Sequence, residues 1–550
     1  MQFVDFKEIV GPTYTLSSLS AECQRCVNLF PEVIESGKGQ NTYYLKETPG
    51  LKNFFYFGAG ISPLGFDAYA GYPIQCLNVT PNGRVFFICL SVLFEITFDG
   101  TTPTVTFRSY LLGAEAISYE GAYPGITAKA ATAKWRMSSN TLILCSVLDL
   151  ESFNKSTAYI PFLSTPTANK GIAVLNLATN ATANSSVQYA YPGYLGTKFI
   201  DFLDNFFLTQ VTNVTGTTSI ALDSFQISPF AWDGVAVWDA VNVFPMESSP
   251  DTLNSLVVNG RYIWLFGPAS YEVFYNAGSS ESLSLAFQRV SGAAYPIGCI
   301  APETVKVLQS QVFWLGSSKD GYGIVYTSNG LQAEKISNTS VELLITSYVT
   351  ISDAIAWSYQ IPGHTVYVIT FPTAKATLAY DMSTGLWHEL SFRDSATGTV
   401  GRHRVNNQIF AFGKNLVGDY EKGIIYELDP DTYSDNIKGV SNPIIRYRRS
   451  PVLATQKRDV FHQKLELDVQ GGVGDSAGSD PKVSIRWSDD NGNTWGNYHT
   501  TSIGKLGEYK KRVIFNRLGI SRKRVYEIYY NEPTPFRLIS AEIGIQVGAN

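Results

Sequence analysis

The alternation of apolar and polar positions is clearest between residues 366 and 390. Val366–Phe371 is a run of β-branched and aromatic residues, which suits a half-buried strand. Thr377–Tyr380 and Leu386–Leu390 follow as two further short strands, and the turn between them contains Gly385, a residue that accepts a positive φ. The pattern predicts three successive antiparallel strands, which is typical of one propeller blade or of the edge of a β-sandwich.

Similar units recur on both sides of this stretch. Each is an apolar, aromatic strand followed by a turn containing glycine and by a second strand, as at residues 82–100, 259–275, 311–326 and 408–428. From residue 259 onward the units are spaced by roughly 45–55 residues, which is within the range of propeller blades. We therefore predict an all-β chain, in which a β-propeller body carries an appended C-terminal β-sandwich domain.

The pattern divides the chain into three parts. We expect an N-terminal arm over residues 1–55, the propeller body over 56–440 and a basic β-sandwich domain over 441–550. Residues 101–250 are less regular and contain polar stretches such as 178–186, which indicates loop insertions on the β scaffold. Loops on a rigid scaffold are where partners are usually contacted.

Helix signals are few. In Thr339–Tyr348, Thr339 and Glu342 have the spacing of a capping box. Four apolar residues of this segment fall on one helical face: Val341, Leu344, Ile345 and Tyr348. Residues 127–135 are a weaker, alanine-rich candidate. We expect helix in under about a tenth of the chain.

Charge divides the chain into two unlike parts. Charged residues make up 16% of the sequence, below the average of about 25%. Residues 441–550 contain 17 Lys+Arg and 11 Asp+Glu, a net charge of +6, so the totals of 42 and 47 leave 25 and 36 for residues 1–440, a net charge of -11. The whole chain, at -5, is therefore no general nucleic-acid binder. This difference in net charge makes the C-terminal domain the candidate region for contact with a negatively charged surface.

Nine cations of this domain form three clusters and are the candidate interface residues: Arg446, Arg448, Arg449, Lys510, Lys511, Arg512, Arg522, Lys523 and Arg524. An interface with an acidic neighbouring protein is one interpretation. A solvated basic face and contact with phosphate are the other two.

The C-terminal domain also contains one Asp-box of the form SxDxGxTW. Its residues are Ser488, Asp490, Gly492, Thr494 and Trp495. The aspartate can accept hydrogen bonds from turn amides, the glycine permits the turn and the tryptophan packs beneath it, so the motif is structural. Sialidases carry several such boxes on propeller blades together with an arginine cluster, which makes a glycan-binding or sialidase-like propeller the alternative function.

Catalytic and cofactor motifs are not found. The sequence has no Walker loop, no GxSxG and no HExxH. Cys23 and Cys26 form a CxxC without a second pair, so we expect reduced structural thiols rather than a metal site, although metal or redox work is the alternative. His364 and His388 have no nucleophile motif beside them, and we expect structural or solvent-facing roles. The N-terminus has no signal-peptide pattern and no apolar run spans a membrane. We therefore expect no enzyme activity, cofactor or metal.

Three groups of short motifs resemble tail hub proteins of short-tailed phages, a family also called nozzle or packaged-DNA-stabilisation proteins. Near the N-terminus these are Asn28–Glu32 and Thr48–Leu51. In the centre they are Asp353-Ala354, Gly363-His364, Tyr367, Phe371-Pro372, Tyr380-Asp381 and Trp387-His388-Glu389. Near the C-terminus they are Gly507–Arg512 and Arg517–Gly519. The resemblance is weakest over residues 101–250.

The resemblance implies a structural virion protein of the phage tail, assembled in the host cytoplasm. In the family six copies form a ring below the adaptor that joins the portal, the genome passes through its channel, and a tail needle or plug closes it. The implied partners are thus other copies of the chain, the portal adaptor, a tail fibre or tailspike, the needle or plug, and genomic double-stranded DNA read without sequence specificity. If so, Asp and Glu should outnumber Lys and Arg on the channel wall, because cationic walls would retard DNA.

Overall fold

The computed structural model describes residues 2–13, 22–34, 42–58, 66–80, 83–89, 92–110, 135–138, 141–146, 171–176, 199–211, 222–231, 238–248, 251–278, 286–318, 321–454, 458–474 and 478–548. The helix expected at 127–135 lies outside these residues apart from Trp135, which begins a strand.

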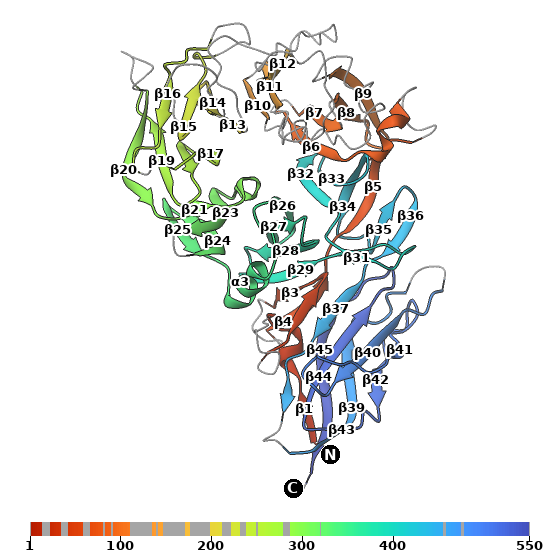
Figure 1. Ribbon diagram of the computed structural model, residues 1–550. Helices are drawn as coiled ribbons and strands as arrows, with labels where there is room; N and C mark the ends of the chain where they lie inside the picture. Colours follow the sequence, from red (N-terminus) through yellow and green to blue (C-terminus); the bar gives the residue numbers. More distant parts are fainter. Residues whose placement is uncertain are drawn as a thin grey trace, which may run out of the picture.

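Successive antiparallel sheets lie around a common centre in the upper part of the molecule (Figure 1). They comprise β6 (Ile74–Val79), β7 (Val85–Cys89), β8 (Val92–Phe98) and β9 (Pro103–Tyr110); β10 (Trp135–Ser138), β11 (Thr141–Ser146) and β12 (Gly171–Asn176); β13 (Ile200–Leu203), β14 (Phe206–Gln210), β15 (Ser224–Ile227) and β16 (Val243–Pro245); β17 (Ser255–Asn259), β18 (Tyr262–Phe266), β19 (Tyr271–Asn276) and β20 (Phe287–Tyr295); β21 (Gly298–Cys299), β22 (Lys306–Leu308), β23 (Gln311–Ser318), β24 (Gly321–Asn329) and β25 (Gln332–Lys335); β26 (Ile355–Ile361), β27 (His364–Phe371), β28 (Ala376–Asp381) and β29 (Leu386–Leu390); and β32 (Val405–Ala411), β33 (Lys414–Asp419) and β34 (Ile424–Asp429).

The contacts between these sheets follow one another in a series around the common centre. One strand of each sheet contacts a strand of the next, in the series β10, β13, β17, β22, β26 and β32, and β32 in turn contacts β6. The last sheet is completed by β5 (Gly50–Tyr56), which pairs antiparallel with β34. Gly50 has to be glycine there, because a Cβ would lie 2.3 Å from the Thr432 carbonyl oxygen. This arrangement is the predicted β-propeller body.

The central sheet confirms the predicted strands and adds one. β27, β28 and β29 pair antiparallel, and β26 precedes them across the Pro362-Gly363 turn. Trp387 is buried, and its Nε1 donates to the Ile336 carbonyl 3.0 Å away. Tyr367 is fully buried, with its hydroxyl 2.8 Å from the Thr304 carbonyl. Tyr380 packs against the Trp387 ring, as expected for a blade core.

The helix α3 (Thr339–Thr346) confirms the strongest helix signal with one correction. The N-cap is Asn338, whose side-chain oxygen accepts from the Val341 amide at 3.0 Å, and not Thr339. Glu342 instead accepts a hydrogen bond from Ser337 and pairs with Lys335. Asn has the same capping chemistry as Thr, so the boundary shifts by one residue.

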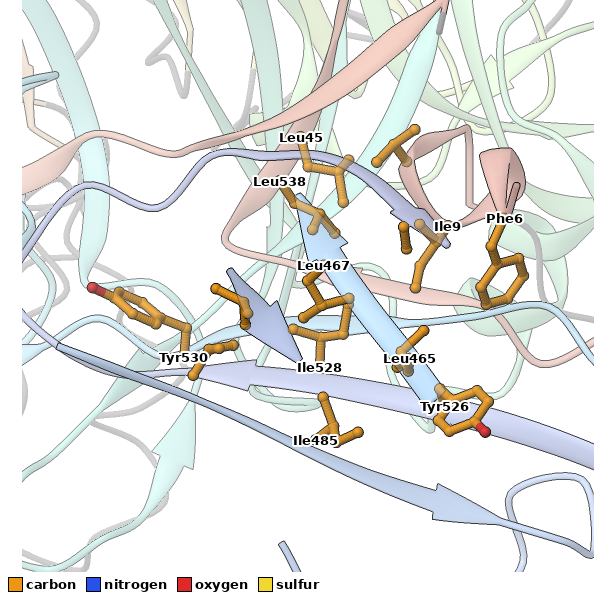
Figure 2. Packing of buried hydrophobic residues seen from close by; sticks show 14 of the residues in the cluster. Phe6, Ile9, Leu45, Leu465, Leu467, Ile485, Tyr526, Ile528, Tyr530 and Leu538 are labelled. Atoms are coloured by element: carbon orange, nitrogen blue, oxygen red, sulfur yellow. The ribbon is translucent and has the colours of Figure 1, made fainter. Parts of the chain in front are cut away.

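The C-terminal domain is a sandwich of two sheets. Its strands are β37 (Arg446–Arg449), β38 (Leu453–Ala454), β39 (Val460–Val469), β40 (Lys482–Ser488), β41 (His499–Ser502), β42 (Val513–Asn516), β43 (Ile520–Ser521), β44 (Lys523–Tyr530) and β45 (Leu538–Val547). One sheet contains β45, β39 and β42, and the other contains β37, β44, β40 and β41. Alternate residues of both face one core, where Leu465 and Leu467 meet Ile485 and Ile528 (Figure 2).

The N-terminal residues belong to both bodies. β1 (Gln2–Asp5) pairs with β45, and β3 (Leu29–Val33) and β4 (Tyr43–Glu47) extend the same sheet. The 3-10 helix η1 (Lys7–Val10) brings Ile9, together with Phe6, into the sandwich core, and Leu45 joins them from β4 (Figure 2). The arm therefore completes the sandwich core as well as the last propeller sheet.

Candidate assembly surface

The nine candidate cations divide by their place on the strands. Arg512, Arg522, Lys510, Lys511 and Lys523 are exposed, and Arg449 is partly exposed. Arg446, Arg448 and Arg524 are buried, which corrects the expectation that all nine offer their charges to a partner. Successive side chains of a strand point to opposite faces, so a run of arginines is split between core and surface.

Arg448 holds the N-terminal arm. Its guanidinium donates to the carbonyls of Glu8 and Ile9, to Thr13 Oγ1 at 3.0 Å and to Gln24 Oε1 at 2.8 Å. Burial lowers the pKa of this arginine. All four acceptors are uncharged oxygens of the arm, so the side chain braces the fold and cannot also reach a partner.

Arg524 is braced by the residue next to the Asp-box aspartate. Its Nε and Nη2 donate to the two carboxylate oxygens of Asp489 at 2.6 and 2.9 Å, and Nη1 donates to the Leu518 carbonyl. The guanidinium carbon also lies 5.2 Å from the centre of the Trp487 ring. A bidentate pair of this kind is both oriented and strong.

Arg449 and Arg486 share one buried carboxylate. Glu527 accepts from Arg449 Nη2 at 3.0 Å and from Arg486 Nε at 2.7 Å. The Trp495 ring centre lies 4.7 and 4.9 Å from the two guanidinium carbons. The positive charge on this face of the sheet is therefore partly neutralised within the domain.

Two exposed arginines also have partners within the domain. Arg522 pairs with Asp459 at 2.9 Å. Arg512 forms a two-pronged pair with Glu466 at 2.6 and 2.7 Å, and this hydrogen bonding lowers the pKa of the glutamate to about 2. Exposed pairs of this kind contribute little to stability.

The Asp-box residues form the predicted turn at the end of β40. Asp490 accepts from the Thr494 amide at 2.8 Å and from the Ser488 hydroxyl at 2.6 Å. Gly492 has a φ of 93°, and its carbonyl accepts from Trp495 Nε1 at 3.0 Å. All of these hydrogen bonds join residues of the same turn. The motif lies in the sandwich and not on a propeller sheet.

We expect Asp490→Ala to loosen this turn at neutral pH. The hydrogen bonds from Ser488 and Thr494 lower the pKa of Asp490 to about 2. A carboxylate with a lowered pKa stabilises the fold above its unfolded pKa of about 3.9, and this contribution is lost as the pH falls through the folded value. The difference in melting temperature between wild type and variant should therefore shrink from pH 7 toward pH 2. A difference that stays constant with pH would contradict this assignment.

The histidines singled out in the sequence are buried. His364 Nδ1 lies 2.7 Å from Asp381 Oδ2, and although burial opposes it, this hydrogen bond helps to lower the pKa of Asp381. Burial lowers the pKa of His388 to about 4, so this ring is neutral at physiological pH. Both rings pack around Phe30 of the arm. Their place in the core fits structural roles.

The cysteines of the CxxC are free thiols. Burial raises the pKa of Cys23 and Cys26 to about 11, which keeps both protonated. Cys26 Sγ lies 3.1 Å from the Leu29 carbonyl. Within the ranges that the structure describes, no group of three or more His, Cys, Asp or Glu has the spacing of a metal site. No helix in the same part of the chain is long and apolar enough to cross a membrane.

A short strand of the arm joins the two bodies. β2 (Arg25–Val27) pairs parallel with β29 of the propeller and antiparallel with β37 of the sandwich, so one sheet runs through both. Arg25 makes a bidentate pair with Glu389 at 2.8 and 2.7 Å. A cavity of about 340 Å³ at this junction is lined by parts of the arm, α3 and β29.

Asn28 fixes the same junction, a role that the sequence analysis, which placed it only in the N-terminal motif, did not assign. Its φ of 53° is left-handed. Its side-chain amide nitrogen donates to the Ile445 carbonyl at 2.7 Å and to the Ser391 carbonyl at 3.0 Å, while its oxygen accepts from the Ser391 amide at 2.9 Å. Asparagine tolerates this backbone better than most residues. An asparagine between two short apolar strands is therefore a sequence signal for a left-handed turn at this position.

These features define a class of protein: a structural β-propeller joined to a β-sandwich, whose buried charges brace the fold. Residues 235–433 match the β-propeller model of the bacteriophage P22 Gp10 family, and residues 446–546 match its β-sandwich model. Together the matches span more than half of the sequence. The chain belongs to this family of phage DNA-stabilisation, or tail hub, proteins, and it is accordingly a structural virion component. The resemblance noted in the sequence is thereby confirmed.

The search of solved structures gives matches of low similarity. An extracellular domain attributed to a hybrid two-component system of B. thetaiotaomicron is 9% identical, with a TM-score of 0.38, over 72% of this chain and 46% of that chain. PorZ from Porphyromonas gingivalis is 10% identical, with a TM-score of 0.30, over 79% and 45%. This chain thus covers less than half the length of each. A comparison with curated proteins finds no match.

Proposed function

We propose that the chain assembles as a homo-hexameric tail hub, or nozzle, below the portal adaptor of a short-tailed phage. The ring forms the DNA exit channel and retains the packaged genome until ejection. The supporting observation is the consecutive match of one chain to the propeller and sandwich models of the Gp10 family. Its further partners in this role are a tail fibre or tailspike and a tail needle or plug.

The charge distribution suits a channel that passes DNA without holding it. Residues 1–440 carry a net charge of -11, and in our proposal they supply much of the channel wall. Acidic or neutral walls repel the duplex and keep it on the axis, whereas free cations would bind phosphates. The pairing of Arg524 with Asp489 and of Arg512 with Glu466 leaves fewer free cations for such contacts. The basic domain is then placed at the adaptor or between subunits.

A glycan-active propeller is the competing class, and the described geometry gives it no support. Its motif, the Asp-box, closes a turn of the sandwich through Ser488 and Thr494. The family that the chain belongs to is structural.

Electron microscopy of the purified chain, with native mass spectrometry, tests the proposed assembly. We expect a ring of six copies with a through-channel. Particles assembled without the chain should package DNA but lose it. The surface of the ring structure should show more Asp and Glu than Lys and Arg along the channel. A monomer that binds sialylated oligosaccharides, or a channel lined mainly by the C-terminal cations, would contradict the proposal.

A further inference from the structure

The connection between β41 and β42 is unusually exposed for an ordered segment. Every residue of Lys505–Arg512 is exposed, including Leu506 at 57% and Tyr509 at 77%. We call residues 504–512 the basic loop. Exposed apolar side chains that stand together within a polar, cationic rim are one of the surface features that mark interaction sites.

Hydrogen bonds hold the basic loop in one conformation. The Lys505 amide donates to Glu508 Oε2 at 2.9 Å, and the Glu508 amide donates back to the Lys505 carbonyl at 3.0 Å. The Gly507 amide donates to the Gly472 carbonyl at 3.3 Å. Gly504 and Gly507 have φ values of 103° and 85°, which other residues adopt only with strain.

Glycines beneath the loop allow its close approach to the sandwich. A Cβ on Gly472 would lie 2.5 Å from Cδ1 of the Tyr509 ring, and a Cβ on Gly474 would lie 2.7 Å from the Leu506 amide nitrogen. Tyr509 is thus placed against backbone and presents most of its ring to solvent. A side chain held in advance loses little conformational entropy on binding, and buried tyrosines are frequent anchors of interfaces.

The lysines of the loop are the uncompensated charges of this surface. Within the described part of the chain, the side chains of Lys505, Lys510 and Lys511 form no ion pair, whereas Arg512 pairs with Glu466. The loop therefore combines two apolar anchors with a rim of three free cations. A partner surface complementary to this loop would need an apolar depression bordered by carboxylates.

We propose that the basic loop docks on the acidic propeller body of a second copy of this chain. Residues 1–440 carry a net charge of -11 against +6 for residues 441–550, so the chain itself contains the unlike surface. A contact between two different surfaces of identical chains repeats around an axis, and it closes into a ring when its rotation is a whole fraction of a turn. Phosphates of duplex DNA would engage the lysines but leave Leu506 and Tyr509 without a role. The inference rests on the proposed ring assembly and assigns the residues that make it.

The test compares a disruptive and a conservative variant of the full chain. Leu506→Ser with Tyr509→Ser removes both anchors, whereas Leu506→Met with Tyr509→Phe keeps their apolar volume. We expect the first variant to raise the concentration at which rings dissociate by about 30-fold, as for the loss of an interface hot spot, and the second to stay near wild type. Sedimentation velocity and native mass spectrometry give this concentration, and thermal unfolding of the monomers checks that both variants fold.

The outcomes separate the docking proposal from the proposed function. A serine variant that forms rings at wild-type concentrations overturns the docking proposal and leaves the ring standing. A wild-type chain that stays monomeric at every concentration overturns both. A 30-base-pair duplex and phosphatidylglycerol vesicles are the remaining probes. If the serine variant loses binding to one of them while its rings persist, the loop serves that partner instead.

Discussion

Arg524→Glu is expected to lower the free energy of unfolding by about 3–5 kcal/mol, since it places a carboxylate without a cationic partner at a buried position. The Arg524 side chain is 1% exposed, and the introduced carboxylate would face Asp489, the partner of the native guanidinium. Urea denaturation at pH 7 measures the loss.

Arg522→Glu and Lys523→Glu, at the two positions that precede Arg524, are the matched controls. Both positions are exposed, with the Arg522 side chain at 69%, so each change should stay within about 0.5 kcal/mol. Reversing all three cations together is therefore expected to destabilise the fold through Arg524. Equal stability of all three variants would show that Arg524 is not buried in solution.

Trp387→Ala is expected to cost about 3–5 kcal/mol through loss of contacts and formation of a cavity. The ring packs in a cluster with Leu378 of β28, Phe313 of β23 and Val341 of α3. Removing it therefore takes contacts away from its own sheet, from the neighbouring sheet and from the helix. The Ile336 carbonyl also loses the hydrogen bond from the indole. Differential scanning calorimetry of the full chain gives the effect.

Tyr322→Ala is the control for this prediction. Tyr322 lies on β24 and is 58% exposed, so truncating it leaves no cavity. The two variants remove large aromatic groups from the same propeller but should differ strongly in melting temperature. Equal melting temperatures would contradict the packing of Trp387 in the blade core.

Local strand patterns carried most of what the sequence could predict. β27, β28 and β29 are apolar, are separated by recognisable turns and were assigned correctly. β26 was not assigned, although Trp357, Tyr359 and Ile361 alternate toward the core and its Pro362-Gly363 turn is visible. That strand could have been found by counting alternate positions across the turn.

The positions of the arginines depend on which face of a strand points inward. Arg446 and Arg448 alternate with Tyr447, and the sequence does not say which of the two sets meets the core. Most of their acceptors are backbone carbonyls, such as those of Glu8 and Glu532, which lie far along the chain. Carbonyls carry no sequence signal, so this part of the candidate surface could not be predicted. The pairing of the arm with both bodies is hidden for the same reason.

The position of β5 and β2 also determines when the protein can finish folding. Both strands leave the ribosome first, yet β5 pairs with β34 and β2 with β37, which are translated several hundred residues later. During synthesis the early strands have unpaired edges, and such edges invite pairing with other chains. Contacts between segments far apart in the sequence also make folding slow, because the entropy cost of closing a long loop is met before the contacts form. The junction between propeller and sandwich therefore forms only after β34 and β37 have been synthesised, and a truncated chain lacking the C-terminal domain leaves one edge of β2 unpaired.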